Sequence, residues 1–297
     1  KMVGLITGNS ITVRPGQPIG NIHATLAVVA REGSTLASRI DAMTIQGARI
    51  GGVIHVNSYA NNIEISNNVI INNIGAFSGG ISLGFPNHGD NLINNPRIHH
   101  NRVIHNGSGE QGFTGGIGIF TAVNGSMIDH NLVCANGSMS SGGGIGHFGR
   151  NQGTTAYISH NDILFNWAFT QGGGILIQGP PPANPADPSA GSGPVTIDSN
   201  LIQGNFGNGD GGGIAALHVG NDRIDVVNNM IVNNLTAEQG GAAVVQDAFN
   251  LTLMNNTIAK NNSTSTSGSF VLNPGAPHSA GLLIHRNTTP FQNSLPA

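Results

Sequence analysis

Aliphatic residues and asparagines alternate in a short block that occurs seven times along the chain. The first copy is NNVIINN at residues 67–73, and each later copy keeps an asparagine, an aliphatic residue two places on and another asparagine five places on. An aliphatic residue also stands three places before the first asparagine, as Ile65 does before Asn68. Apolar positions two residues apart have the period of a β-strand, and no stretch of ten residues has the period of a helix. The pattern therefore predicts short strands throughout.

The blocks recur with a loose period of about thirty residues, which is typical of a repeat architecture. Each repeat also carries a glycine doublet and an apolar stretch, such as GGIGIF at residues 115–120. Three strands are predicted per repeat: one after the glycines, one ending at the first asparagine and one between the two asparagines. The first asparagine column comprises Asn68, Asn101, Asn131, Asn161, Asn200, Asn229, Asn256 and Asn287. The second comprises Asn73, Asn106, Asn136, Asn166, Asn205, Asn234 and Asn261.

Three strands per repeat predict one coil of a solenoid. Equal positions of stacked coils lie ~4.8 Å apart, so that an asparagine column forms a ladder of hydrogen-bonded amides. Asparagine accepts the left-handed backbone of a tight bend, and we expect glycine to do the same at the third corner. The predicted fold is an all-β solenoid of about eight to nine three-strand coils with asparagine ladders.

From about Ile40 to Asn287, the pattern NNxIxxN…GGGI resembles that of right-handed parallel β-helix proteins, the pectate-lyase-like superfamily. The resemblance implies the right-handed parallel β-helix but no particular activity, because this coil carries lyases, hydrolases, epimerases, adhesins and spacers alike. Residues 1–39 are predicted to form an irregular first coil or N-terminal cap, residues 40–287 the β-helix, and residues 288–297 a C-terminal tail. Open solenoid ends need caps, and with no capping helix in the pattern we expect the chain to belong to a longer one.

Composition narrows the range of partners. Only 8% of the residues are charged, the net charge is −3, and Lys1 and Lys260 are the only lysines, which argues against a nucleic-acid partner. No apolar run reaches the ~20 residues of a membrane span. The single cysteine, Cys134, excludes an internal disulfide framework. We expect an extracellular or cell-surface domain whose surface is made of small polar groups.

The residues two and four places before each ladder asparagine are predicted to face solvent. Their chemistry is richest between Arg97 and Asp198. Two long inserts, GFPNHGDNLINNP and GPPPANPADPSAGSGP, fall at the edge of this face. Long inserts in a solenoid tend to cluster on its binding side, and these two would bracket the third and fourth coils. The alternative is that they are tolerated surface insertions.

A polysaccharide is the ligand that this face suggests. Tyr157 would be the stacking platform, with Met127 and Ser159 as further substrate contacts. Asp129 and Asp198 occupy one column two coils apart, ~9.6 Å from each other by the coil repeat. That separation is near the upper end of the range for inverting glycoside hydrolysis, although two aspartates can share a column by chance.

A lyase reaction would need a base, for which Arg97 and His99 are the candidates, and often calcium on several carboxylates. The predicted catalytic residues are therefore Asp129, Asp198, His99 and Arg97. No coil offers three adjacent acidic residues, which counts against a lyase and leaves calcium open.

Histidines form a second unusual group. His100, His130 and His160 immediately precede ladder asparagines in three successive coils, with His99 beside them. These four histidines could bind copper or zinc, with Asp129 as a ligand or as a hydrogen-bond partner of one. Alternatively, imidazole replaces an amide as a stacked, hydrogen-bonded corner residue. The sequence requires no cofactor.

Apolar residues also occupy outward positions between the asparagine columns, and this stripe suggests self-association or packing against the rest of a longer chain. It comprises Val69, Ile71, Leu132, Cys134, Leu164, Leu201, Met230 and Val232. Three functions are thus predicted as alternatives. The first is an extracellular domain that binds, and could cleave, a polysaccharide. The second is a non-catalytic structural or adhesive segment of a large surface or assembly protein, and the third is a copper or zinc site.

Overall fold

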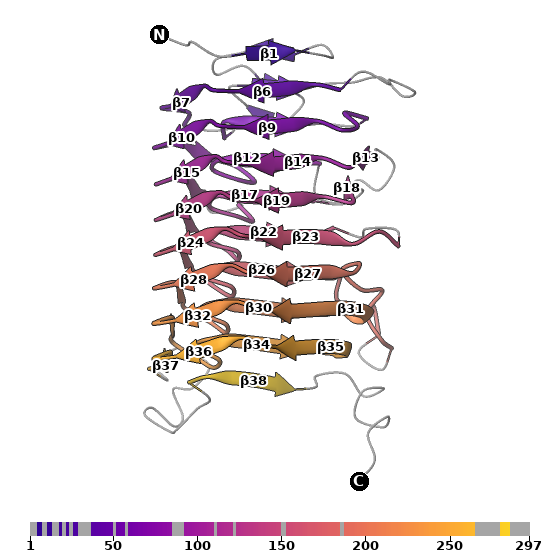
Figure 1. The fold of residues 1–297 in the computed structure, drawn as a ribbon, viewed down its shortest axis with the longest axis vertical. Coiled ribbons are helices and arrows are strands. Elements are labelled where there is room, and N and C mark those ends of the chain that lie inside the picture. The colour runs from indigo at the N-terminus through magenta and orange to yellow at the C-terminus, as the bar shows by residue number, and fades with distance from the viewer. Residues whose placement is uncertain are drawn as a thin grey trace.

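The chain folds into stacked coils of short strands, as a computed structural model shows (Figure 1). The structure describes strands at residues 5–7, 11–13, 18–19, 22–23 and 26–28, and then residues 37–49, 52–56, 59–84, 92–109, 112–120, 123–149, 153–184, 187–264 and 280–285. Over these residues the protein is all-β, and the predicted parallel β-helix is confirmed. None of the described segments is a helix long and apolar enough to cross a membrane.

Four long sheets run along the axis of the solenoid, and each full coil contributes one strand to each. The nine-stranded sheet consists of β1 (Leu5–Thr7), β6 (Arg39–Asp41), β9 (Glu64–Ser66), β14 (Arg97–His99), β19 (Met127–Asp129), β23 (Ala156–Ser159), β27 (Val195–Asp198), β31 (Gly220–Val227) and β35 (Ala248–Met254). The eight-stranded sheet consists of β7 (Thr44–Gln46), β10 (Val69–Ile71), β15 (Arg102–Ile104), β20 (Leu132–Cys134), β24 (Asp162–Leu164), β28 (Leu201–Gln203), β32 (Met230–Val232) and β36 (Thr257–Ala259).

The ten-stranded sheet holds the strands that follow the glycine doublets. It consists of β2 (Ile11–Val13), β5 (Leu26–Val28), β8 (Ile54–Val56), β12 (Ile81–Leu83), β17 (Ile117–Ile119), β22 (Ile145–His147), β26 (Ile175–Gln178), β30 (Ile214–Leu217), β34 (Ala243–Gln246) and β38 (Leu282–His285). Two small pairs are added: β13 (Ile93–Asn94) with β18 (Val123–Asn124), and β3 (Pro18–Ile19) with β4 (Ile22–His23).

A seven-stranded sheet of two-residue strands is the element that the sequence pattern did not predict. It consists of β11 (Ile74–Gly75), β16 (Gly107–Ser108), β21 (Gly137–Ser138), β25 (Trp167–Ala168), β29 (Phe206–Gly207), β33 (Leu235–Thr236) and β37 (Asn262–Ser263). Each strand follows the second asparagine of its repeat. Two residues cannot display an alternation of apolar and polar positions, so only their recurrence could have revealed them.

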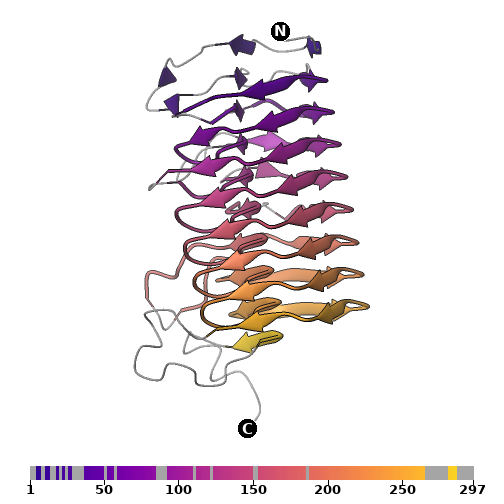
Figure 2. The same cartoon turned by 90° about the vertical axis from the view of Figure 1, so that its left-hand side faces the viewer.

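Pairing is parallel from coil to coil, and it becomes antiparallel only near the N-terminal end, where β1 pairs with β6, β2 with β5, and β3 with β4. The aliphatic residues at the predicted inward positions are buried, as Ile98, Ile128 and Ile158 are in the nine-stranded sheet. Figure 2 shows the stacked coils from the side.

Both asparagine ladders are present. At Asn131, the side-chain Oδ1 accepts hydrogen bonds from the backbone N–H and the Nδ2 of Asn101, at 2.9 and 3.0 Å, while its own Nδ2 donates to the carbonyl oxygen of Ile98 at 2.9 Å. The same arrangement continues to Asn256 in one column and to Asn261 in the other. The predicted ladder residue Asn287 lies outside the described residues.

The left-handed residue at each corner is not the ladder asparagine but the residue before it. His100, His130 and His160 all have φ of 55°. The glycine prediction is confirmed: at the third corner the left-handed residue is a glycine, such as Gly142 (φ 70°), one place before its doublet. At Gly143, within the doublet, space is what requires glycine, because a Cβ there would lie 2.3 Å from the carbonyl oxygen of Trp167.

Candidate binding face

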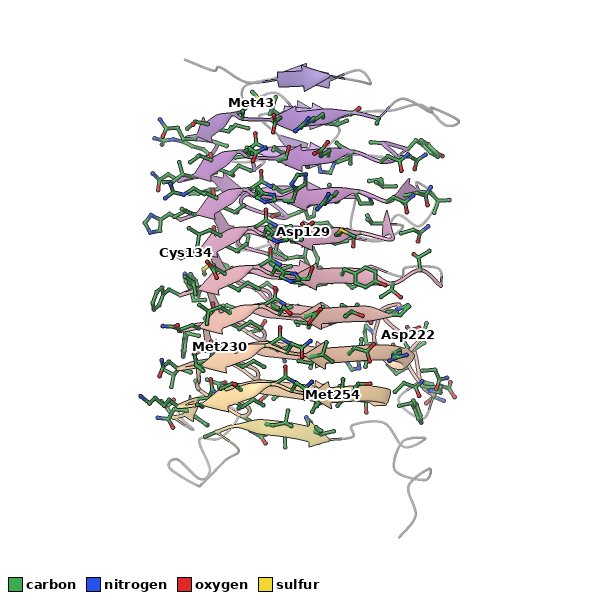
Figure 3. All side chains as sticks on the ribbon, viewed as in Figure 1. Met43, Asp129, Cys134, Asp222, Met230 and Met254 are labelled. Carbon is green, nitrogen blue, oxygen red and sulfur yellow. The ribbon has the colours of Figure 1, made fainter. Side chains whose placement is uncertain are left out.

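The predicted site residues share the outer surface of the nine-stranded sheet. We call this surface the central face and define it by the outward residues of β14, β19, β23 and β27. One column runs through Arg97, Met127, Tyr157 and Thr196, and the next through His99, Asp129, Ser159 and Asp198. Asp129 lies near the middle of the sheet (Figure 3). The register therefore brings the predicted catalytic and substrate-binding residues onto one surface.

Met127 and Tyr157 form an apolar platform on the central face. They are register partners on adjacent strands, and 38% and 42% of their surfaces are exposed. Their neighbour in the next coil is the small Thr196. An exposed aromatic ring beside a flexible apolar side chain offers a flat surface for an amphipathic ring such as a sugar.

Asp129 is the most heavily engaged residue of the face. Arg97 donates from Nε to Oδ1 at 3.0 Å and from Nη2 to Oδ2 at 2.9 Å, and His130 Nδ1 donates to Oδ2 at 2.9 Å. Although it is on the outer side of the sheet, Asp129 is buried beneath these partners. Such a two-pronged contact between guanidinium and carboxylate is among the stronger ion pairs in proteins.

These contacts argue against the predicted roles of Asp129 as a catalytic acid or base and of Arg97 as a base. Burial alone would raise the pKa of Asp129, but the hydrogen bonds from Arg97 and His130 and the charge of Arg97 outweigh it and hold that pKa below the usual range. A carboxyl group in this state is ionised at neutral pH and is a poor proton donor. The hydrogen bond to Asp129 raises the pKa of Arg97, which makes this side chain a poor base as well.

Asp198 stands two coils from Asp129 in the same column, as predicted, with Ser159 between them. Its Oδ1 accepts hydrogen bonds from Ser199 Oγ and Asn228 Nδ2, each at 2.9 Å. Both aspartates therefore accept hydrogen bonds from side chains at the adjacent corner: Asp129 from His130, and Asp198 from Ser199 and Asn228. Contacts of this kind stabilise the corner.

The histidines stack along one corner column. The rings of His100 and His130 are 5.0 Å apart and tilted by 2°, and those of His130 and His160 are 5.0 Å apart and tilted by 5°. His99 donates from Nε2 to Glu64 Oε1 at 2.8 Å, so its Nδ1 can accept from His100 Nδ1, also at 2.8 Å.

This stacking does not suit a shared metal ion. Two imidazole nitrogens on one zinc ion, each ~2.1 Å from it, can be at most ~4.2 Å apart. Parallel rings stacked at 5.0 Å hold equivalent nitrogens farther apart than that. Among the described residues, no group of three or more His, Cys, Asp and Glu side chains could hold a metal ion. The geometry favours the alternative of a corner stack.

The structure describes more of the second long insert than of the first. Of the first, residues 85–91 lie outside the described residues, so its role as a wall stays a prediction. The second is tied to coils on either side: Ser192 O accepts from His147 Nε2 at 3.0 Å, and Gly193 N–H donates to Asp222 Oδ2 at 2.8 Å. Asp222 marks this edge of the nine-stranded sheet in Figure 3. Burial lowers the pKa of His147 to about 4.

The sequence reading missed an ion-pair network at the near end of the central face. Arg39 contacts Asp41 and Glu64, each at 3.4 Å, and Glu64 also pairs with His99. The sequence did contain a signal for the contact across the coils, because Glu64 precedes Arg97 by one full repeat and the two residues are therefore neighbours on adjacent strands. The sequence analysis also did not single out three exposed aromatic residues, Phe165, Trp167 and Phe169. A signal was present for Trp167, because its register partners in the two preceding coils are Gly137 and Gly107.

The predicted apolar stripe lies on the outside of the eight-stranded sheet. Met230 is 51% exposed, whereas the other members are only partly exposed. Burial raises the pKa of the Cys134 thiol within this stripe. Packing between neighbouring coils thus covers much of the surface that suggested a partner.

No family model, curated protein or solved structure matches this chain in the three comparisons made. The functional conclusion therefore depends on the geometry described above.

Proposed function

We propose that this protein is a β-helix domain of the pectate-lyase-like type that binds a polysaccharide on the central face, in an extracellular or cell-surface setting. The observation that carries the proposal is the exposed platform of Met127 and Tyr157 between charged and hydroxyl-bearing side chains. Sugar rings combine an apolar face with a polar rim, and this surface offers both partners side by side.

Binding is supported better than cleavage. The carboxylate of Asp129 is engaged by Arg97 and His130, and that of Asp198 by Ser199 and Asn228. Hydrolysis by an inverting mechanism needs one carboxyl group that is protonated and a second that activates water, and Asp129, which Arg97 and His130 keep ionised and covered, fits neither role. The alternative of a non-catalytic structural or adhesive solenoid also fits this state of the carboxylates, but it gives no reason for the exposed platform.

Affinity electrophoresis through gels that contain single soluble polysaccharides tests the proposal. We expect at least one polysaccharide to retard the wild-type protein and Tyr157→Ala to abolish most of that retardation. Phe249→Ala is the matched control, because Phe249 is an exposed aromatic residue of the same sheet, on β35, far from the platform. Equal retardation of all three proteins would show that the platform is not the binding site.

A further inference from the structure

Three aromatic side chains of a single coil are exposed on another side of the solenoid. Phe165, Trp167 and Phe169 are 58%, 40% and 53% exposed, and Met139 of the preceding coil is 42% exposed beside Phe169. We call these four residues the aromatic corner. It lies where the eight-stranded sheet turns into the seven-stranded sheet, away from the nine-stranded sheet that carries Tyr157. Trp167 is the only tryptophan of the protein.

Glycines in the neighbouring coils allow two of these rings to lie along the backbone. A Cβ at Gly137 would be 2.1 Å from Trp167 Nε1, so the indole covers the coil on the N-terminal side. A Cβ at Gly204 would be 2.6 Å from Cδ1 of Phe165, so the phenyl ring covers the coil on the C-terminal side. The two rings together form an aromatic surface that spans three coils.

Phe165 is also strained. Its φ is 53°, in the left-handed region that a bulky side chain rarely adopts. The same corner is left-handed in other coils too: it holds Gly47, Asn72, Gly204 and Asn233, which are suited to this conformation, and also His105, Ala135 and Lys260, none of which is as bulky and apolar as Phe165. Because the ring is mostly exposed, burial does not compensate for the strain. A strained residue that gains so little from packing is a candidate for a functional role.

The surroundings of the aromatic corner contain few charged side chains. Residues 131–146, 163–184 and 199–209 of three successive coils contain no Asp, Glu, Lys or Arg, and the charged residues that directly adjoin these ranges, Asp162, Asp198 and Asp210, are acidic. Hydroxyl and amide side chains occupy its rim, among them Ser140, Thr170 and Gln203. A phosphate, an anionic lipid or a charged glycan would find no opposite charge here.

The size of the patch argues against a second copy of the chain as its occupant. Four residues along the chain at ~3.3 Å and three coils at ~4.8 Å give a surface of roughly 200 Å². A stable protein partner needs about 800 Å² on each side. A few sugar rings fit the smaller area, and stacking on exposed aromatic rings is the contact that their apolar faces make.

We propose that the aromatic corner is a second ligand site, which binds an uncharged glycan by stacking sugar rings on Trp167 and Phe165. This site is separate from the central face, and neither proposal depends on the other.

The sole tryptophan makes the site directly observable. Cellohexaose, xylohexaose and mannohexaose are titrated into the whole protein while tryptophan emission and acrylamide quenching are recorded. We expect at least one of them to shift the emission saturably and to protect Trp167 from acrylamide, while hexagalacturonate does neither. Calorimetry with the same sugar then compares variants: Trp167→Ala should lower the affinity at least tenfold, and Phe165→Asn should lower it severalfold.

Two variants guard against a loss of folding. Phe165→Asn places in this corner a residue found there in other coils, so its melting temperature should equal or exceed that of the wild-type protein. Ile74→Ala is the matched control, since Ile74 is 52% exposed in the column of Trp167 but three coils away, and it should bind like the wild type.

Tyr157→Ala separates the two proposals, since it should leave the tryptophan titration unchanged. The inference is overturned if no uncharged hexasaccharide protects Trp167 at millimolar concentration, or if Trp167→Ala binds as tightly as the wild type. It is likewise overturned if sedimentation shows a self-association that Trp167→Ala abolishes, because a second copy would then occupy the corner.

Discussion

Asp129 is buried on a face that is otherwise open to water, and its partners explain why. The guanidinium of Arg97 covers it from the preceding coil, and the imidazole of His130 covers it from the adjacent corner. The sequence could place all three residues on one surface, because strand alternation fixes which side chains point outward. It could not show that two of them close over the third, since that depends on rotamers and not on register.

The pH dependence of stability tests this ion pair. The pKa of Asp129 is lowered in the folded protein relative to ~3.9 in the unfolded chain, so the pair stabilises the fold above that pH and loses its effect as pH falls through the folded value. We expect Asp129→Asn to be about 1–2 kcal/mol less stable at pH 7, since Arg97 is half-exposed.

In urea unfolding at a series of pH values from 7 downwards, the difference between Asp129→Asn and the wild type should shrink as the pH falls through the lowered pKa of Asp129 and the carboxylate takes up its proton. A difference that stays constant with pH would contradict the pairing.

His147 makes a separate contribution to the pH dependence of stability, because burial disfavours its charged form. Its pKa is about 4 in the folded protein and ~6.5 in the unfolded chain. The fold therefore has its full stability above about pH 6.5 and loses stability as the pH falls toward 4. The loss amounts to roughly 3 kcal/mol at most. Unfolding measured at pH 7.5 and at pH 4.5 should show a larger fall for the wild type than for His147→Gln. The exposed His105→Gln should behave like the wild type, and an equal fall in all three proteins would rule out this role.

At the scale of elements, strands could be predicted where the same type of side chain recurs in every repeat and has the same structural role. The ladder asparagines and the inward aliphatic residues beside them predicted one strand before and one strand after the first asparagine of each repeat, and these strands form the repeating part of the nine- and eight-stranded sheets. The two-residue strands such as Gly107–Ser108 were not predictable, because their residues vary and their pairing is almost entirely between backbones. The left-handed corner was misplaced by one residue, since asparagine often occupies both positions, as at Asn67 and Asn68.

The ladder itself offers a quantitative test. Asn131→Ala would leave the backbone N–H of Asn101 without its buried acceptor and would remove the side-chain donor from the carbonyl oxygens of Ile98 and Asp129. At ~1–3 kcal/mol for each unsatisfied group, we expect a loss of about 3–5 kcal/mol. The control is Asn256→Ala at the described end of the same ladder, where the side chain is more exposed and its loss should cost less than half as much. Chemical unfolding that ranks the two variants equally would contradict the ladder's energetic role.

At the scale of the whole molecule, stacking turns single residues into extended surfaces. Along each coil, the histidine stack lies at the corner between the nine-stranded and eight-stranded sheets, the apolar stripe lies on the eight-stranded sheet, and the aromatic corner lies at the next turn. The sequence predicted the central face because its polar residues stood out against a low-charge background. It did not predict the aromatic corner, because the strain of Phe165 and the position of Trp167 over Gly137 become visible only when neighbouring coils are stacked.

The most direct test of the central claim, that the central face binds a polysaccharide without cleaving it, is product analysis after prolonged incubation. The polysaccharide that retards the wild-type protein is incubated with it, and new reducing ends and the ultraviolet absorbance of unsaturated uronates are followed. We expect retention that depends on Tyr157 and no products beyond those of the protein-free control. Products that accumulate over many turnovers, and that Asp129→Asn or Asp198→Asn abolishes, would contradict the account and return the aspartates to a catalytic role.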